Sequence, residues 1–216
     1  MVSGVGVLDK SVLIIEAVQE GARSLTELTA ATGLSRATAH RLATALETHH
    51  LLRRSPDGGF ALGWRLVALG RAAEAGQGLI AAADPILRTL RDRTGESAQL
   101  YLRDGDHRVC VASSESPHGL RTIVSVGAVL SVERGSAGHV LLGEVGPHGW
   151  VASVAEREIG VASVSAPVRG ANGEIVAAIG VSGPIERTTR LPGKRYGAAV
   201  VDAARTLEAA LVPGSA

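Results

Sequence analysis

Two short helices joined by Gly33 form the clearest pattern in the first quarter of the chain. Ser24 and Glu27 have the spacing of a capping box, in which the Ser24 hydroxyl binds the Glu27 amide and the Glu27 side chain reaches back. The helix that they open ends at Gly33, which suits the left-handed position after a helix. Ser35 then caps another helix that runs to about His49. Because a helix-turn-helix has a short turn that often contains Gly, this pattern predicts one.

The helix from Ser35 to His49 has two contrasting faces when it is wound at about 100° per residue. One face is apolar, and we expect it to pack on the preceding helices: Ala39, Leu42 and Leu46. The other face carries arginines and short polar or methyl-bearing side chains: Arg36, Ala37, His40, Arg41, Thr44 and Glu47. A recognition helix in the DNA major groove needs this composition, although an ordinary surface helix also tolerates it. An amphipathic helix over residues 7–19 comes first in the chain, with one apolar stripe: Leu8, Val12, Ile15 and Val18.

A predicted hairpin follows these helices and strengthens the DNA-binding interpretation. Two short β-like segments, residues 51–54 and 60–62, flank Asp57-Gly58-Gly59, and Asp-Gly and Gly-Gly are strong hairpin signals. Three helices and a hairpin make a winged helix. Residues 36–71 contain six arginines and only two acidic residues, although the whole chain has a net charge of +1. The predicted DNA contacts lie on the recognition helix and the wing: Ser35, Arg36, Ala37, Thr38, His40, Arg41, Thr44, Arg53, Arg54 and Gly58.

With these features, the chain resembles the IclR (isocitrate lyase regulator) family of bacterial transcription factors. The stretches that match its DNA-binding half, within residues 5–76, are VGVLDKSVLIIEAV, SLTELTAATGLSRATAHRLATALETHHLLRR and GGFALGWRLVALG. Further matches follow in the family's order: ILRTLRDRTGESAQLYLRDGDHRVCVA, GSAGHVLL and EREIGVASVSAPVRGANGEIVAAIGVSGPIERTT. TGESAQLY, EREIGVASVSAPVRG and VSGPIERTTR are similar to NdgR-type members, which are associated with amino-acid metabolism. The resemblance implies a double-stranded DNA operator, a small-molecule effector, and a homodimer or dimer of dimers as partners.

The second half of the chain shows its own alternation of strands and helices. Asp84 is a good N-cap before Pro85, and the helix that they open runs to about Thr94. Four β-rich segments form two predicted hairpins: 97–103 with 108–114, and 160–168 with 174–181. A closing helix over residues 194–211 turns one apolar stripe inward: Val200, Ala204, Leu207 and Leu211. This pattern predicts an α/β domain with an antiparallel sheet, and the resemblance implies a GAF-like effector-binding fold.

The predicted architecture is therefore α+β, with a winged helix-turn-helix followed by a GAF-like domain. We expect the DNA-binding domain over residues 1–63, a linker helix over 64–80, and an effector-binding and oligomerisation domain over 81–216. The linker is apolar enough to predict a dimer contact at Leu66, Val67 and Leu69. Residues 143–149 depart from the family, whose members carry a few dozen largely helical residues there. We expect this shortening to remove a helix or two, and with them one wall of the effector pocket.

The resemblance places the effector among loops and strand edges of the second half. The matching positions are Thr122, Ser136, Ala137, Ser153, Ser163, Gly180 and Ser182. Ser136 opens a helix whose free amides favour an anion. These residues predict a small, hydroxyl-lined pocket without a guanidinium group, suited to a small polar or amphipathic metabolite. Serines on buried strands equally often satisfy only the local backbone.

No residue pattern indicates catalysis, a cofactor or a metal. Cys110 lies between Val109 and Val111, so we expect a buried, inert thiol. The seven histidines show no HExxH spacing, and no glycine-rich nucleotide loop occurs. Glu156-Arg157-Glu158 is a short charge run typical of solvated surface. No apolar run approaches the ~20 residues that cross a bilayer, so we expect a soluble cytoplasmic protein without a membrane partner.

Three functions fit these observations. The first is a transcription factor that binds a specific DNA sequence and whose operator affinity changes when a small metabolite binds. The second is a stand-alone small-molecule-binding or enzymatic GAF-like protein, in which the N-terminal helices only mediate oligomerisation. The third is a DNA-binding protein whose shortened second half only oligomerises. Retention on heparin or random duplex DNA separates the second from the others, and calorimetry with metabolites separates the first from the third.

Overall fold

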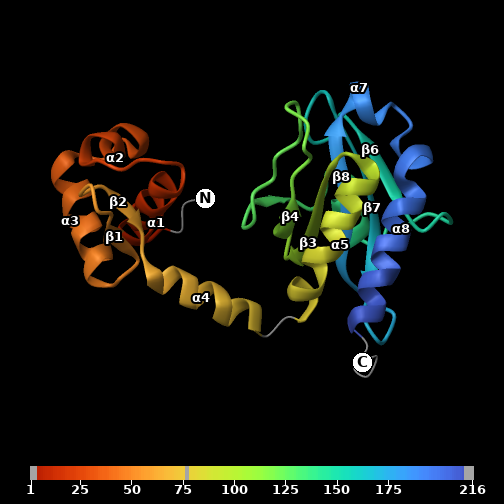
Figure 1. The fold of residues 1–216 in the computed structure, drawn as a ribbon, viewed down its shortest axis with the longest axis horizontal. Coiled ribbons are helices and arrows are strands. Elements are labelled where there is room, and N and C mark those ends of the chain that lie inside the picture. The colour runs from red at the N-terminus through yellow and green to blue at the C-terminus, as the bar shows by residue number, and fades with distance from the viewer. Residues whose placement is uncertain (1–3, 76–77, 212–216) are drawn as a thin grey trace. The chain divides into compact units, whose positions relative to one another are not determined.

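The protein folds into two compact units, residues 1–76 and 77–216. The structure, a computed structural model, describes residues 4–75 and 78–211 (Figure 1). The first unit contains helices α1 (Gly6–Gln19), α2 (Leu25–Thr32) and α3 (Arg36–Thr48), strands β1 (Leu52–Arg54) and β2 (Phe60–Leu62), and helix α4 (Trp64–Ala75). Strands β1 and β2 pair antiparallel, so the unit has the order of a winged helix.

Local capping signals fix the helix boundaries of the first unit as the sequence predicts. The Ser24 hydroxyl accepts from the Glu27 amide at 3.2 Å, and the Glu27 carboxylate accepts from the Ser24 amide at 2.8 Å. Gly33 ends α2 with φ +67°, in the left-handed region where Gly has no Cβ penalty. Ser35 caps α3 through the Thr38 amide at 3.3 Å. The predicted capping box, turn and third helix are therefore confirmed.

The core of the first unit differs from the prediction in α1. The buried face of this helix carries Ile14, Ala17 and Val18, whereas Leu8 and Val12 are 55% and 43% exposed. Residues 14, 17 and 18 have the i, i+3, i+4 spacing of one helical face, and α2 and α3 pack on that face. Of the predicted stripe, Val18 lies in this core and Ile15 packs against it, whereas Leu8 and Val12 lie on a neighbouring, exposed face, so the prediction is wrong for those two residues.

The second unit is built on a six-stranded antiparallel sheet with the order β5-β4-β3-β8-β7-β6. The strands are β3 (Ser97–Asp104), β4 (His107–Ser114), β5 (Val129–Ser131), β6 (Val151–Val154), β7 (Val161–Arg169) and β8 (Ile175–Pro184). Both predicted hairpins, β3 with β4 and β7 with β8, are present. The two hairpins join at the centre of the sheet, where β3 pairs with β8. This pairing joins segments far apart in the sequence, so local sequence signals do not predict it.

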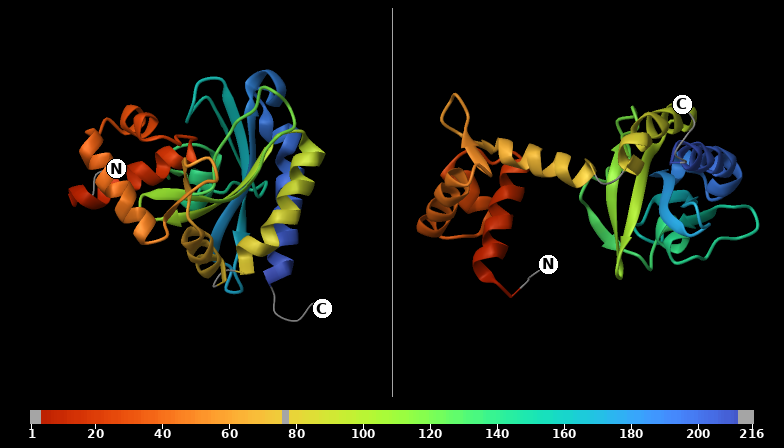
Figure 2. Two further views of the ribbon diagram at one scale, coloured as in Figure 1. Left: turned by 60° about the vertical axis from the view of Figure 1, so that its left-hand side comes forward. Right: turned by 90° about the horizontal axis from the view of Figure 1, so that it is seen from below.

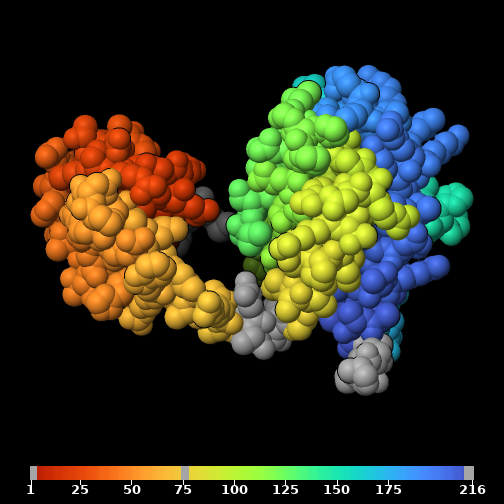
Figure 3. All heavy atoms as spheres, in the orientation of Figure 1, coloured from red at the N-terminus to blue at the C-terminus, as the bar shows by residue number. Residues whose placement is uncertain are grey.

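Helices cover the two faces of this sheet unequally. Helices α5 (Gly78–Thr94) and α8 (Pro192–Leu211) pack side by side on one face, and α5 forms part of the surface of the unit (Figures 2 and 3). Strand residues alternate between this face, which takes Leu100 and Ile179, and the other face, which takes Tyr101 and Ala178. The short helix α6 (Ser136–Leu141) packs among the side chains of the second face.

Helix α5 begins earlier than its sequence signals predict. Asp84-Pro85 resembles a helix start, yet Pro85 lies inside α5, which begins at Gly78. A proline there leaves the carbonyl four residues before it without its helical donor. Ala83 is buried in the core, and Leu79 and Ala82 pack against it. The turn before Pro85 is therefore retained because its apolar side chains pack on the sheet.

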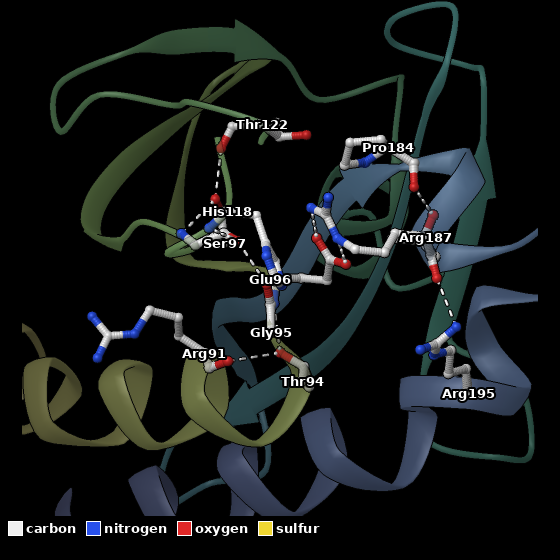
Figure 4. A network of polar contacts seen from close by, with 12 residues as sticks. Arg91, Thr94, Gly95, Glu96, Ser97, His118, Thr122, Pro184, Arg187 and Arg195 are labelled. Carbon is white, nitrogen blue, oxygen red and sulfur yellow. Dashed lines mark hydrogen bonds and ion pairs between the residues drawn. The ribbon is translucent and has the colours of Figure 1, made fainter. Parts of the chain in front are cut away.

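Two short elements and a buried ion pair complete the unit. The strand β5 and the helix α7 (Ile185–Thr188) were not predicted. Glu96, completely buried just before β3, forms a bidentate pair with Arg187 of α7, with both N···O distances 2.7 Å (Figure 4). The Arg187 carbonyl accepts from Arg195 of α8 at 2.7 Å (Figure 4). These contacts join β3, α7 and α8 at one end of the sheet.

Candidate DNA-binding and effector sites

The outward face of α3 presents its arginines to solvent. Ala39, Leu42 and Leu46 are buried, as predicted, and anchor the helix to the unit. The opposite face is exposed: Arg36, Ala37, His40, Arg41 and Thr44. Within residues 4–75 no ion pair involves Arg36 or Arg41. These two guanidinium groups are therefore available to base edges or phosphates.

Two of the predicted DNA contacts already have local partners. The Ser35 hydroxyl donates to the Thr38 hydroxyl at 2.9 Å and accepts from the Thr38 amide, so the pair caps α3. This arrangement fixes the direction in which the first turn of α3 presents its side chains. Of the residues predicted from the helix, these two have an evident structural role.

The wing is tied to α3 by Arg54. Its Nε donates to the Glu47 carboxylate at 2.8 Å, and its Nη1 donates to the Gly58 carbonyl at 3.1 Å. The same guanidinium lies 3.8 Å from the centre of the Phe60 ring. Gly58 has φ +82°, which a wing turn of this shape requires. Arg54 therefore positions the wing, whereas the half-buried Arg53 lies 4.8 Å from the ring centre of Trp64.

The second unit contains a cavity of about 30 Å³ between α6 and strands β3, β7 and β8. Six of the seven predicted effector residues line it: Ser136, Ala137, Ser153, Ser163, Gly180 and Ser182. Thr122 lies elsewhere, because its carbonyl accepts from Ser97 at 2.7 Å and it borders a separate groove beside Ile123 and Ile159. The structure thus brings together residues that lie up to 46 positions apart in the sequence.

Serine hydroxyls form the polar centre of this cavity. The Ser136 Oγ lies 2.8 Å from both the Ser163 and the Ser165 Oγ atoms. Ser182 donates to the side-chain oxygen of Gln99 at 3.2 Å. A Cβ at Gly180 would lie 2.2 Å from the Ser165 Oγ, so any larger residue at position 180 would collide with the Ser165 side chain. This contact explains why glycine stands at position 180.

A buried arginine overturns the expectation of a pocket without a guanidinium group. Arg108 of β4 is 3% exposed and lines the cavity, and so does Arg157. The Arg108 Nη1 donates to the Ser131 carbonyl at 2.6 Å and also to the Arg134 carbonyl. Burial lowers the pKa of Arg108, although an arginine remains a cation. The sequence already indicated that Arg108 is buried, because Arg108 and Cys110 are two residues apart and therefore lie on the same face of a predicted strand.

Gln99, Tyr101 and Ser165 are further cavity residues that the sequence did not single out. All three lie on strands of the predicted hairpins, with side chains on the face that α6 covers. Which strand residues meet at one cavity depends on the pairing of β3 with β8. No local pattern encodes that pairing, which explains why these residues were missed.

A cluster of charged side chains lies at the N-terminal end of α6. The Glu156 carboxylate accepts from the Gly135 amide at 3.0 Å, from Ser153 at 2.7 Å and from the His139 Nε2 at 2.6 Å. The His139 Nδ1 lies 2.7 Å from the Glu144 carboxylate. Glu156 is exposed, as expected for a solvated charge run, but its carboxylate also accepts these three hydrogen bonds. Because the Gly135 amide already donates to this carboxylate, it is not a free donor at the N-terminal end of α6.

These contacts shift the pKa values of both partners. The hydrogen bond to Glu156 is the main reason why the pKa of His139 is raised above its ordinary value. Partial burial acts to raise the pKa of Glu156. The hydrogen bonds from Ser153, His139 and Gly135 outweigh burial and hold this pKa below its ordinary value. The pair therefore favours a protonated imidazole beside an ionised carboxylate.

The described residues offer little that resembles catalytic or metal chemistry. Cys110 is buried, as predicted, and burial raises the pKa of its thiol to about 11, so the nucleophilic thiolate is disfavoured. Within residues 4–75 and 78–211 no group of three or more His, Cys, Asp or Glu side chains is arranged to hold a metal ion. None of the helices in these ranges is long and apolar enough to span a membrane.

Comparison with known families assigns both units. Residues 7–56 match the IclR helix-turn-helix domain, and residues 72–147 and 142–209 match the C-terminal domain of the bacterial transcriptional regulator IclR. The chain belongs to the IclR family. It is accordingly a DNA-binding transcriptional regulator and not an enzyme.

Individual relatives align over most of the IclR-family chain. It is 25% identical over 238 positions to the transcriptional repressor IclR of Escherichia coli, covering 92% of this chain and 87% of the relative. The crystal structure of the Thermotoga maritima IclR has a TM-score of 0.76 and 20% identity, covering 95% of this chain and 98% of that one. An IclR homologue from Microbacterium hydrocarbonoxydans complexed with 4-hydroxybenzoate has a TM-score of 0.72, 20% identity and the same coverage. These structures share the fold.

The alignments also bear on residues 142–149. The C-terminal family domain matches in two stretches that overlap at residues 142–147. The alignment with the E. coli repressor, at 238 positions, is longer than the entire chain of 216 residues. The relative therefore has residues without a counterpart here. In this chain, α6 ends at Leu141, and a short connection leads through Gly149 to Trp150, whose ring packs against Gly193 and Gly197 of α8.

Proposed function

We propose that this IclR-family regulator reads an operator with α3 and the wing and responds to a small molecule bound in the Ser136 cavity. The observation that carries the proposal is the outward face of α3, where Arg36 and Arg41 are exposed and form no ion pair with any residue that the structure describes, on a helix with a capped start and a buried inner face. The predicted contact residues on α3 and the wing, from Ser35 to Gly58, contain four arginines that would attract phosphates or bases.

The effector part of this proposal rests on the cavity. Its lining combines the hydroxyls of five serines, two of them hydrogen-bonded to Ser136, with backbone from Ala137 and Gly180, which suits a small polar ligand. A homologue with the same fold binds 4-hydroxybenzoate, which supports a small-molecule role for this type of domain. We further propose that the regulated genes belong to amino-acid metabolism, a proposal that rests on the NdgR-like stretches of the sequence.

We also propose a homodimer or dimer of dimers that acts on cytoplasmic DNA. One recognition helix makes few base contacts. A dimer contacts two half-sites of the operator and so makes more of them. Helix α4 exposes apolar side chains that a partner would cover: Trp64, Val67 and Leu69. We assign residues 1–63 to DNA binding, 64–80 to the link between domains, and 81–216 to effector binding and oligomerisation, with a shortened segment at 143–149.

The experiment that tests this function measures binding of the purified protein to its own upstream DNA, with and without a panel of metabolites. Specific binding that one metabolite shifts supports the whole proposal. Specific binding without any response favours a second half that only oligomerises. Absence of DNA binding, together with metabolite binding, would favour a stand-alone small-molecule-binding protein.

A further inference from the structure

Arg54 of β1 uses all three nitrogens of its guanidinium group within the first unit. Its Nε donates to one oxygen of the Glu47 carboxylate at 2.8 Å, and its Nη2 donates to the other oxygen at 3.3 Å. Its Nη1 donates to the Gly58 carbonyl at 3.1 Å. Glu47 lies on α3, and Gly58 lies in the turn between β1 and β2, so one side chain joins the recognition helix to the wing (Figure 1).

The geometry of this contact restricts the orientation of the wing as well as its distance from α3. A bidentate pair between an arginine and a carboxylate fixes how the two planar groups face each other. Phe60 is the antiparallel partner of Arg54 across the two strands, and its buried ring lies beneath the guanidinium group. A movement of the wing relative to α3 therefore breaks the pair between Arg54 and Glu47.

Backbone contacts hold the base of the wing and the turn at its tip. Gly63 lies so close to the end of α3 that a Cβ there would be 2.0 Å from the His50 carbonyl oxygen. In the turn, the Ser55 amide donates to the Gly59 carbonyl at 2.9 Å, and the Gly58 amide donates to the Ser55 carbonyl at 2.8 Å. The turn is thus a compact unit on a fixed base, and the ion pair described above links this unit to α3.

We propose that Glu47 and Arg54 are positioning residues for operator binding, because their ion pair holds the wing at the orientation in which it reaches DNA. This inference rests on the proposed DNA-binding function and assigns an indirect role to two charged residues within it. A carboxylate beside DNA repels the phosphates, so charge alone would make Glu47 unfavourable for binding. Its role in holding the wing outweighs this repulsion, and Arg54 acts through the wing and not through a phosphate contact of its own.

The direction of the effect of Glu47→Met on operator affinity is the direct test. This substitution removes a negative charge near DNA, which on charge alone strengthens binding. We expect it to weaken binding of the full-length protein to its own upstream DNA by about 2- to 5-fold, the range that an exposed ion pair supplies. The matched control is Glu16→Met, which removes an exposed carboxylate of α1 that has no ion pair among the described residues, and it should not weaken binding. Unchanged or tighter binding by Glu47→Met, or equal weakening in both variants, would overturn the proposal.

Variants of Arg54 separate a positioning role from a phosphate contact. Arg54→Lys keeps the positive charge but loses the planar fork that binds Glu47 and Gly58 together, so it should weaken operator binding nearly as much as Arg54→Met, roughly 5- to 10-fold. The double variant Glu47→Met, Arg54→Met should bind no more weakly than Arg54→Met, because both remove the same interaction. Arg71→Lys, at an exposed position of α4, is the control and should bind as the wild type does. Full affinity in Arg54→Lys, or additive losses in the double variant, would indicate a direct phosphate contact and overturn the proposal.

Hydrogen exchange of the DNA-free protein separates this inference from the proposed function and from a loss of global stability. Peptides that cover residues 52–62 should exchange faster in Glu47→Met than in the wild type, while those of α1 and α2 should not change. Faster exchange confined to the wing, with a wild type that binds no DNA, would support the wing contact and contradict the proposed function. Operator binding by the wild type, with unchanged exchange of the wing in Glu47→Met or faster exchange throughout the unit, would support the function and overturn the positioning role.

Discussion

At the scale of single residues, Arg36 and Arg41 are the side chains on which operator recognition should depend most directly. Both are exposed on α3, and neither forms an ion pair within residues 4–75. We expect Arg36→Ala or Arg41→Ala to weaken operator binding by roughly 1–3 kcal/mol if the arginine reads a base, with relaxed specificity at one position. A phosphate contact would instead weaken all sequences alike and reduce the salt dependence.

Fluorescence anisotropy with operator and scrambled duplexes at several salt concentrations measures both effects. Arg205→Ala, an exposed arginine on α8, is the control and should bind as the wild type does. Unchanged affinity in both α3 variants would mean that this face of the helix does not contact DNA.

His139 is the residue whose protonation should affect stability near neutral pH. Because its folded-state pKa is raised, its contribution is fully present below the ordinary value of 6.5 and is lost as pH rises through the raised value. Glu156 has a lowered pKa, so its contribution is present above 4.5 and is lost as pH falls through the lowered value. We expect His139→Gln to lower the free energy of unfolding more at about pH 6 than at about pH 9.

Urea denaturation of both proteins at the two pH values gives the difference. The exposed His107→Gln, on the β3–β4 hairpin, is the matched control and should show little change at either pH. A difference for His139→Gln that is the same at both pH values, or larger at the higher one, would show that the imidazole is not held as a cation beside Glu156.

At the scale of elements, sequence signals succeeded where they were local. The Ser24 box, the left-handed Gly33 and the turns of both hairpins each involve a few consecutive residues, so they could be predicted. The start of α5 could not, because packing of Leu79 on the sheet extends the helix past the signal at Pro85. The predicted serines of the cavity came from a family resemblance, whereas Gln99 and Ser165 required the strand pairing.

The capping box gives a prediction for a whole element. Ser24→Ala removes the side-chain acceptor for the Glu27 amide, and loss of such a cap costs about 0.5–2 kcal/mol. We expect α2 to fray and the first unit to unfold at lower urea concentration, while the second unit is unaffected. Thr26→Ala, at an exposed position of the same helix, should change stability much less. Equal effects of the two variants in urea unfolding would contradict the role of the cap.

At the scale of the whole molecule, the proposed assembly makes a prediction about α4. We expect sedimentation at micromolar concentration to give at least a dimer, and a Val67→Glu, Leu69→Glu double variant to dissociate it, because a charge on a covered apolar face is costly. Leu191→Glu, an exposed leucine of the second unit, is the control and should leave the assembly intact. A monomeric wild-type protein that still binds an operator specifically would refute the proposal.

The central claim joins the two units: a ligand in the Ser136 cavity changes the affinity of α3 and the wing for DNA. A ligand does this only through different affinities for two states of the protein, and such coupling is typically about 1–3 kcal/mol. Ser136→Leu places a bulky side chain where the Ser163 and Ser165 hydroxyls now meet it. The variant should therefore lose the response, because the ligand can no longer enter.

The most direct measurement is a titration of operator affinity with and without the effector, for the wild type and for Ser136→Leu. The account predicts that saturating effector shifts the operator affinity of the wild type by roughly 5- to 150-fold, and that Ser136→Leu shows no shift. A shift of equal size in both proteins would contradict the account, since the effector would then act from another site.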